Sequence, residues 1–314
     1  MSLTSPERKG PPFVDVIVPV FNDSERLTRC LRALEEQSYP ADQYQVLVID
    51  NGSSEDITGV CRAFPRVRCL SEPRPGSYAA RNKGIACSEG QILAFTDADC
   101  LPHLDWLEKG VTRLMAMPEC GLVGGDVIVF PRDSTRRTAA ELYESAFAFQ
   151  QRRRVEESHW SVTANLFVRR SVFESVGPFD AGLLSGGDVE WGKRAHALGH
   201  QIMFAEDARV DHPARSSLGE LMAKARRVAG GGRAATKRYD ASNRNLLPYL
   251  ARALFRSFRK TVRILAGDRF NYAGAQRFTL LERLKICVVL NLFTMRRLME
   301  VVSLRLLNRP ASRS

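Results

Sequence analysis

The 314-residue chain has no long hydrophobic run and no cysteine pair with the spacing of a metal site. Its seven cysteines stand singly, and no CxxC pair or Cys/His cluster appears, so neither a zinc site nor a disulfide framework is supported. We interpret them as reduced cytosolic thiols that act as small core residues. The longest late apolar run, Ile286–Met295, has about half of the roughly 20 residues that a membrane-spanning helix requires.

The pattern near the N-terminus also lacks a secretory signal. Residues 1–12 are polar, and the first apolar run, Phe13–Phe21, is interrupted by Asp15 and Pro19. The chain has no internal repeat, no low-complexity stretch and no GxGxxG near Val20. The last of these absences argues against a Rossmann dehydrogenase.

What is present is an ordinary globular composition with an uneven distribution of charge. Hydrophobic residues make up 44% and charged residues 26%, which is enough for a sizeable core. From Arg215 to Ser314 the sequence has 22 Lys/Arg and 5 Asp/Glu, whereas residues 1–214 have 24 basic and 30 acidic residues. A mildly acidic body with a strongly basic tail indicates an anionic partner for the tail, either nucleic acid or a membrane surface.

Short apolar strands alternate with helical patterns in the first half of the chain. This alternation predicts an α/β fold with a mostly parallel, doubly wound sheet and helices on both faces. The strands are expected at Val14–Val20, Val46–Asp50, Val67–Leu70, Ile92–Thr96, Gly121–Phe130, Val162–Val168 and Gln201–Ala205. The helices are expected at Ser24–Gln37, Ile57–Phe64, Ser77–Ala86, Leu104–Met117, Ala139–Arg154, Val189–Leu198, Leu246–Leu265 and Phe278–Leu307.

Carboxylate side chains follow three of the predicted strands, in Asn22-Asp23, Asp50-Asn51 and Asp97-Ala98-Asp99. Ligands of open α/β sheets bind at the carboxyl ends of the strands. Two aspartates at i and i+2 repel each other unless something positive lies between them. A divalent cation that grips a diphosphate fits this DxD pattern, and a turn or a helix N-cap is the alternative interpretation.

Several further segments join these strand ends in an order and spacing that resemble an inverting family 2 glycosyltransferase with a GT-A fold, of the bacterial type. The resemblance covers about residues 13–230 and implies a GT-A domain followed by a basic helical extension. The donor half resembles the family at Pro19–Asp23, Val48–Asp56, Gly76–Gly90 and Ile92–Asp99. The acceptor half resembles it at Thr163–Arg170, Val176–Asp180, Gly186–Trp191 and Val210–His212.

This resemblance implies a nucleotide-sugar site at the strand ends. In the family, the positions that match the backbone around Pro19 and Phe21 and the carboxylate of Asp50 bind the base and the ribose. Arg81 matches a basic residue near the nucleotide, and Asp97 matches a carboxylate near the ribose or the metal. The alternative for Arg81 is a solvated helix charge. We expect the donor to be UDP-linked.

The resemblance also implies a divalent metal, Mn or Mg. Asp99 matches the direct metal ligand, and His212 matches a residue that completes the metal or pyrophosphate shell. A lone histidine is otherwise a structural residue. Asp23 has two interpretations, a contact to the nucleoside or a cap of the following helix, and the cap is favoured.

Asp188 matches the family's general base, which takes the proton of the acceptor hydroxyl during inversion. Many relatives carry Glu-Asp where this chain has Gly187-Asp188, so Glu190 is the alternative carboxylate, and a helix N-cap is the alternative role for Asp188. Trp160 and Trp191 either stack on a sugar face or belong to the core.

The chain divides into three predicted parts: a flexible N-terminus (1–12), the GT-A domain (13–232) and a basic amphipathic helical region (233–314). In the last part Leu281, Val288, Met295 and Val302 recur every seven residues, with basic residues largely off that stripe. We interpret these helices as lying on an anionic membrane surface, on the cytoplasmic face of the inner membrane. Packing on the catalytic domain or on a second subunit is the alternative.

The sequence therefore predicts a metal-dependent, inverting hexosyltransferase that moves a sugar to a glycan or lipid-linked acceptor in polysaccharide or glycoconjugate biosynthesis. A nucleotide-sugar pyrophosphorylase is one alternative, but no glycine-rich phosphate loop follows the first strand. A non-catalytic, basic nucleic-acid-binding protein is another, but no nucleic-acid signature with interleaved aromatics is present. We expect no nucleic-acid partner.

Overall fold

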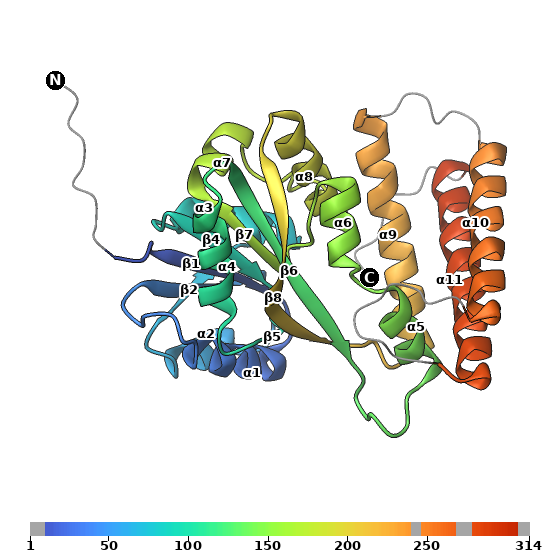
Figure 1. The fold of residues 1–314 in the computed structure, drawn as a ribbon, viewed down its shortest axis with the longest axis horizontal. Coiled ribbons are helices and arrows are strands. Elements are labelled where there is room, and N and C mark those ends of the chain that lie inside the picture. The colour runs from blue at the N-terminus through green and yellow to red at the C-terminus, as the bar shows by residue number, and fades with distance from the viewer. Residues whose placement is uncertain (1–9, 240–245, 268–277, 307–314) are drawn as a thin grey trace.

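The computed structural model describes residues 10–239, 246–267 and 278–306 (Figure 1). Four parallel strands come first, in the spatial order β3 (Val67–Ser71), β2 (Tyr44–Asp50), β1 (Val14–Val20) and β4 (Ile92–Thr96). The helices between them are α1 (Ser24–Glu35), α2 (Ile57–Arg62) and α3 (Ser77–Cys87). The alternation of strand and helix predicted for this half is confirmed.

The second half of the chain extends the same sheet from β4. The sheet continues with β7 (Asn165–Arg169), β6 (Cys120–Phe130), β8 (Gln201–Pro213) and the short β5 (Leu101–Pro102). Here β7 is antiparallel to both of its neighbours, whereas β6 and β8 are parallel to each other. β8 is one strand, longer than the segment predicted at Gln201–Ala205. The helices are α4 (Trp106–Ala116), α5 (Ala139–Phe147), α6 (Gln151–Ser158), α7 (Arg170–Val176) and α8 (Gly187–Ala197).

Helices cover both faces of the sheet, as predicted, because the side chains of each strand alternate between two apolar layers. In β1, Val16 and Val18 belong to the layer under α1, α2 and α4, and Ile17 belongs to the layer under α3, α7 and α8. The mixed sheet with two helical layers is the expected architecture.

The single helix predicted over Ala139–Arg154 is wrong, because the chain breaks between α5 and α6. Phe149 and Gln150 have left-handed φ angles of 59° and 41°. Beyond the break, Gln151 is buried and donates to the carbonyl of Gly125 in β6. The two helices are anchored in different parts of the protein, α6 on the sheet and α5 on the C-terminal helices, so one straight helix does not serve both.

The C-terminal part consists of α9 (Leu218–Tyr239), α10 (Leu246–Ala266) and α11 (Leu280–Leu306), which lie side by side next to α5 (Figure 1). They form a third apolar core, separate from the two layers of the sheet. The predicted boundary at residue 232 falls inside α9, and residues 1–9 of the predicted flexible N-terminus lie outside the described residues. The core consists of Ala140, Leu142, Tyr143, Ala146, Leu221, Ile264, Ile286, Cys287, Val289 and Leu290.

None of the helices in the described ranges combines the length and the apolar character that crossing a bilayer requires.

A buried ion cluster joins α5 to α9. Glu144 is 1% exposed and accepts from Lys224 Nζ at 2.6 Å and from Arg215 Nη1 at 3.0 Å. Burial raises the pKa of Glu144, but the charges of Lys224 and Arg215 outweigh it and bring that pKa below its ordinary value. Burial disfavours the charged form of Lys224 as well and lowers the pKa of this amine to about 8. The carboxylate thus holds two cations at the junction.

We expect Glu144→Gln to destabilise the protein by about 3–5 kcal/mol, because it leaves two largely buried cations without a counter-charge. Urea unfolding followed by circular dichroism measures this loss. Glu25→Gln is the matched control, because Glu25 forms an exposed helical pair with Arg29, and it should change stability by less than about 0.5 kcal/mol. Equal stability of the two variants would contradict a structural role for the cluster.

Candidate active site

The carboxyl ends of β1 and β2 form one edge of the site. Pro19 lies opposite Ile49 in the parallel register, and Asp50 lies opposite the last residue of β1. Phe21, just beyond β1, is 50% exposed. The Asp50 carboxylate accepts a hydrogen bond from the backbone N–H of Ser53 at 2.9 Å, which folds the following loop. The structure therefore brings these three predicted donor-site residues to the same edge of the sheet.

Asn51 positions the next element, a role that the sequence did not reveal because this residue was interpreted only as part of a turn. Its buried side-chain amide donates to the carbonyls of Glu72 and Arg74, and its Oδ1 accepts from the backbone N–H of Gly76, each at 2.8 Å. Gly76 has φ +127°, a conformation that favours glycine, and directly precedes α3. These bonds fix the start of α3 against the end of β2.

Arg81 of α3 lies inside the site rather than in solvent. It is 4% exposed, and its Nη2 donates to Oδ1 of Asp97, which follows β4 directly. Its guanidinium carbon is 5.6 Å from the ring centroid of Tyr78, one turn earlier in the same helix. The solvated-charge alternative for Arg81 is therefore wrong.

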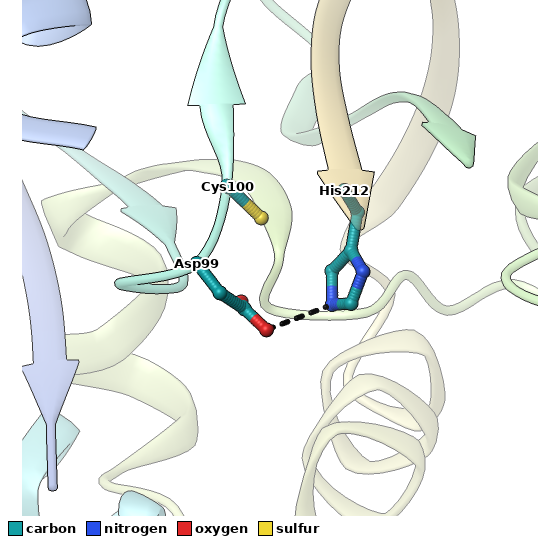
Figure 2. Close-up of side chains that lie close together, drawn as sticks. All are labelled: Asp99, Cys100 and His212. Carbon is teal, nitrogen blue, oxygen red and sulfur yellow. Dashed lines mark ion pairs between the residues drawn. The ribbon is translucent and has the colours of Figure 1, made fainter. Parts of the chain in front are cut away.

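Asp99 and His212 meet across the sheet, from the loop after β4 and from β8 (Figure 2). Asp99 Oδ2 is 3.5 Å from His212 Nε2. The other ring nitrogen of His212, Nδ1, is 2.8 Å from the carbonyl oxygen of Pro213, which only accepts, so Nδ1 carries a proton. Nε2 is therefore the ring nitrogen that faces the Asp99 carboxylate.

Cys100 lies beside this pair, as Figure 2 shows, and its Sγ is close enough to form a cluster of three potential ligands. The thiol is buried, and its sulfur is 4.0 Å from the carbonyl oxygen of Ala164. Burial, together with the charges of Asp99 and Asp97, raises the pKa of Cys100 well above its ordinary value. Thiolates favour soft metals whereas carboxylates suit Mg and Mn, so Asp99 and His212 are the candidate ligand pair for such a cation.

Asp188 lies at the start of α8 and contacts α3. Its Oδ1 accepts from the Tyr78 hydroxyl at 3.2 Å and from the backbone N–H of Val189 at 2.9 Å. A Cβ on Gly187 would lie 2.7 Å from the Tyr78 ring, so only glycine allows α8 to approach α3 this closely. Tyr78 was missed from the sequence, although it stands three residues before Arg81 and therefore on the same helix face.

The electrostatic environment holds Asp188 partly toward its neutral form. Burial raises the pKa of Asp188 above the ordinary aspartate value, against the Val189 N–H and the charges of Arg154 and Arg81, which lower it. A carboxylate whose pKa is raised is a stronger base than an exposed aspartate. A raised carboxylate pKa is what a general base requires.

Two further arginines approach the same carboxylates. Arg154 of α6 and Arg227 of α9 are half-buried, and both interact electrostatically with Asp188. Burial lowers the pKa of each, and Arg215 lowers that of Arg227 further. Within the described ranges, neither guanidinium has an ion-pair partner within 4 Å, so both are available to an anionic ligand. The sequence placed Arg227 only in the basic tail.

The remaining sequence candidates have structural partners. Glu190 is 6% exposed and accepts from Arg194 Nε at 3.0 Å, so it is one partner of an ion pair within α8. Trp191 is 1% exposed and belongs to the core. Asp23 occupies the N-cap position of α1, but its carboxylate binds Arg26 rather than a backbone N–H, so the favoured side-chain cap is wrong.

The sheet, its strand-end carboxylates and the acid at the start of α8 define a glycosyltransferase of the GT-A fold. The structure is similar to the mannosyltransferase PcManGT from Pyrobaculum calidifontis, solved in complex with GDP-Man and Mn2+. The TM-score is 0.62 and the identity is 20%, over 98% of this chain and 90% of that one.

Sequence comparison gives the family. Residues 15–177 match the family model described as glycosyl transferase family 2. Over 226 residues the chain is 44% identical to the glycosyltransferase AglE of Haloferax volcanii, which covers 70% of this chain and 73% of AglE. It is also 29% identical to a pre-mycofactocin glycosyltransferase of Mycobacterium tuberculosis, of which it spans 47%. The chain belongs to glycosyltransferase family 2, and this assignment leaves the pyrophosphorylase and nucleic-acid-binding alternatives without support.

Proposed function

We propose that this protein transfers a hexosyl group with inversion from a nucleotide sugar to an acceptor hydroxyl, with Asp188 as the general base. One observation carries the proposal: α3 holds both sides of the reaction. Tyr78 binds Asp188, and Arg81, one turn later, binds Asp97 at the strand ends. The base and the donor site are therefore fixed relative to each other by a single rigid element.

Asp188 has the geometry that a base needs. Both of its hydrogen bonds to described residues go to Oδ1, and Oδ2 is left for the acceptor hydroxyl. In inversion the hydroxyl attacks the anomeric carbon on the face opposite the leaving nucleoside diphosphate, while its proton passes to the base. Oδ2 takes that proton, and the Tyr78 hydroxyl keeps the carboxylate oriented during the transfer.

The residues present also fit a divalent metal, Mn or Mg. Asp99 Oδ2 and His212 Nε2 face each other at 3.5 Å, which is close enough for both atoms to bind one cation. When bound, such a cation neutralises charge on the diphosphate leaving group. Asp99 and His212 would hold it, and Arg81 orients the neighbouring carboxylate of Asp97.

The donor and the acceptor are proposed at the level of chemical class. We retain a UDP-linked sugar as the expected donor, with GDP as the competing nucleotide because the solved mannosyltransferase was in complex with GDP-Man. A glycan or lipid-linked acceptor is supported by a relative in Methanococcus voltae whose name describes a dolichyl phosphate-linked acceptor. A thermal-shift panel of nucleotide sugars with Mn2+ tests the donor, because a ligand that binds the folded state raises the melting temperature.

We further propose that Arg227 binds the diphosphate of the donor. Arg227→Ala should weaken donor binding by about tenfold or more, because a charge-assisted hydrogen bond to phosphate is lost. Calorimetric titration with the nucleotide sugar identified above measures this change. Arg226→Ala is the matched control, because Arg226 is exposed and lies 3.7 Å from Glu300 of α11. Unchanged donor affinity in Arg227→Ala would assign this arginine a structural role instead.

A cytoplasmic location is part of the proposal. All seven cysteines lie within the described residues and are free thiols, although Cys61 and Cys69 are close enough to interact. Free thiols are typical of a reducing compartment.

A further inference from the structure

Two stripes of apolar side chains remain exposed on the C-terminal helices, although the opposite faces of these helices form the third core. Phe255 and Phe258 of α10 are 61% and 64% exposed, and Val288 of α11 is 59% exposed. Monomeric proteins rarely expose a continuous apolar surface of this extent without a partner for it. The other exposed apolar residues of the two stripes are Leu247, Leu254, Val262 and Leu265 on α10, and Leu281, Leu284, Leu292, Met295 and Met299 on α11.

The two stripes lie on the same side of the helix pair. The helices are antiparallel, because Ser257 bonds to Asn291 and Thr294 whereas Thr261 bonds to Cys287. On each helix, the exposed stripe is centred about 90° around the helix axis from the residues that contact the other helix, in the direction of increasing residue number. Viewed from one end of the pair, residues advance clockwise along one antiparallel helix and counterclockwise along the other. The two rotations of about 90° therefore place both stripes on the same side of the pair. We call this surface the α10–α11 apolar face.

Positive charge borders this face, and negative charge is kept away from it. α10 contains no acidic residue, and its exposed Arg252 and Arg259 adjoin the edge of the apolar stripe. On α11, exposed Lys285 lies at the other edge. The acidic side chains Glu282 and Glu300 of α11 point away from the face, toward ion pairs with arginines of the rest of the protein.

This arrangement favours a lipid surface over a protein. In the third core α11 packs on α5 and α9, and α10 packs on α11, so contact with the catalytic part does not require the exposed stripes. An apolar surface with a cationic border matches the layered chemistry of a bilayer interface, where acyl chains lie beneath anionic headgroups. A second copy of the same face would instead bring the arginines of both copies together.

We propose that the α10–α11 apolar face lies in the interfacial plane of an anionic bilayer and holds the enzyme there without spanning it. The phenylalanines and leucines enter the acyl boundary, and the arginine and lysine side chains reach the lipid phosphates. The active site is thereby kept at the surface where a lipid-linked acceptor is found. Membrane binding does not depend on the identity of the donor or on catalysis.

Flotation of the full chain with vesicles tests this inference. Vesicles containing phosphatidylglycerol should bind the protein at about 0.05 M salt, and binding should weaken at about 0.5 M salt because the charges are screened. Phe255→Ser/Phe258→Ser should lower the partition coefficient by about tenfold or more. Leu104→Ser/Leu198→Ser is the matched control, because these leucines are 63% and 57% exposed outside the face, and it should bind as the unmodified protein does.

Three outcomes would overturn the inference. The first is absence of binding to either phosphatidylglycerol or phosphatidylcholine vesicles at low salt. The second is equal flotation of Phe255→Ser/Phe258→Ser and the unmodified protein. The third is a dimer in analytical ultracentrifugation that the double variant converts to a monomer without any vesicle binding, which assigns the face to a second copy. Donor hydrolysis in solution should be unchanged in the double variant, so failure of this inference is distinct from failure of the proposed activity.

Discussion

Asp188→Asn is expected to lower sugar transfer by roughly 10²- to 10⁴-fold while donor affinity is retained. The substitution keeps the size of the side chain and its bond from Tyr78, but an amide does not accept the proton of the acceptor hydroxyl. Because burial raises the pKa of Asp188, the rate of the unmodified enzyme should fall on acidification with a midpoint above the ordinary aspartate value of about 4. Initial rates of transfer across pH, with donor affinity from calorimetry, measure both effects.

Asp42→Asn is the control for this substitution, because Asp42 is exposed in the loop before β2, and it should transfer at the unmodified rate. Tyr78→Phe is a second comparison, since it removes the hydroxyl that orients Asp188 but keeps the ring that packs on Gly187. It should lower turnover less than Asp188→Asn does and move the acid midpoint upward, because the hydrogen bond from the Tyr78 hydroxyl lowers the pKa of Asp188. If Asp188→Asn transfers normally, or loses donor binding equally, the base assignment is wrong.

Asp99→Ala is expected to abolish donor turnover and metal binding with little change in melting temperature. The carboxylate makes no hydrogen bond to a backbone N–H among the described residues and lies at the end of a loop, so its removal costs little stability. His212 alone offers one ligand atom, which is too few to hold Mn2+ or Mg2+ against water. Hydrolysis of the donor with and without chelator, together with calorimetric titration with Mn2+, measures the loss.

Asp211→Ala is the matched control for the metal ligand. Asp211 precedes His212 in β8, and it pairs with His103 at 3.1 Å rather than with the site. Consecutive strand residues point to opposite faces, so the same substitution one position away should leave metal binding intact. Full activity of Asp99→Ala, or of the unmodified protein in excess chelator, would refute metal dependence through Asp99.

Local patterns were sufficient for most of the sheet but not for the region between β6 and β7. Runs such as Val14–Val20 and Ile92–Thr96 carry the burial signal within themselves, so strands were predicted at the positions observed. The apparent helix at Ala139–Arg154 has no proline or glycine to mark its break. The break occurs because α5 packs on α11 whereas Gln151 is held by β6, and both partners are distant in sequence.

The candidate site divides in the same way. The sequence by itself determined that Asp50, Asp97 and Asp99 end strands, that Asp188 starts a helix, and that the tail is basic with an apolar stripe, since each feature depends on neighbours a few residues away. Only the tertiary structure decided that Tyr78 holds Asp188, 110 residues later, and that Arg227 of the tail reaches the same carboxylates. The tertiary structure also decided that the apolar stripes of α10 and α11 lie on the same side of the helix pair. Periodicity records which face of an element is buried, but the partner of that face is set by how the elements pack, which no local pattern contains.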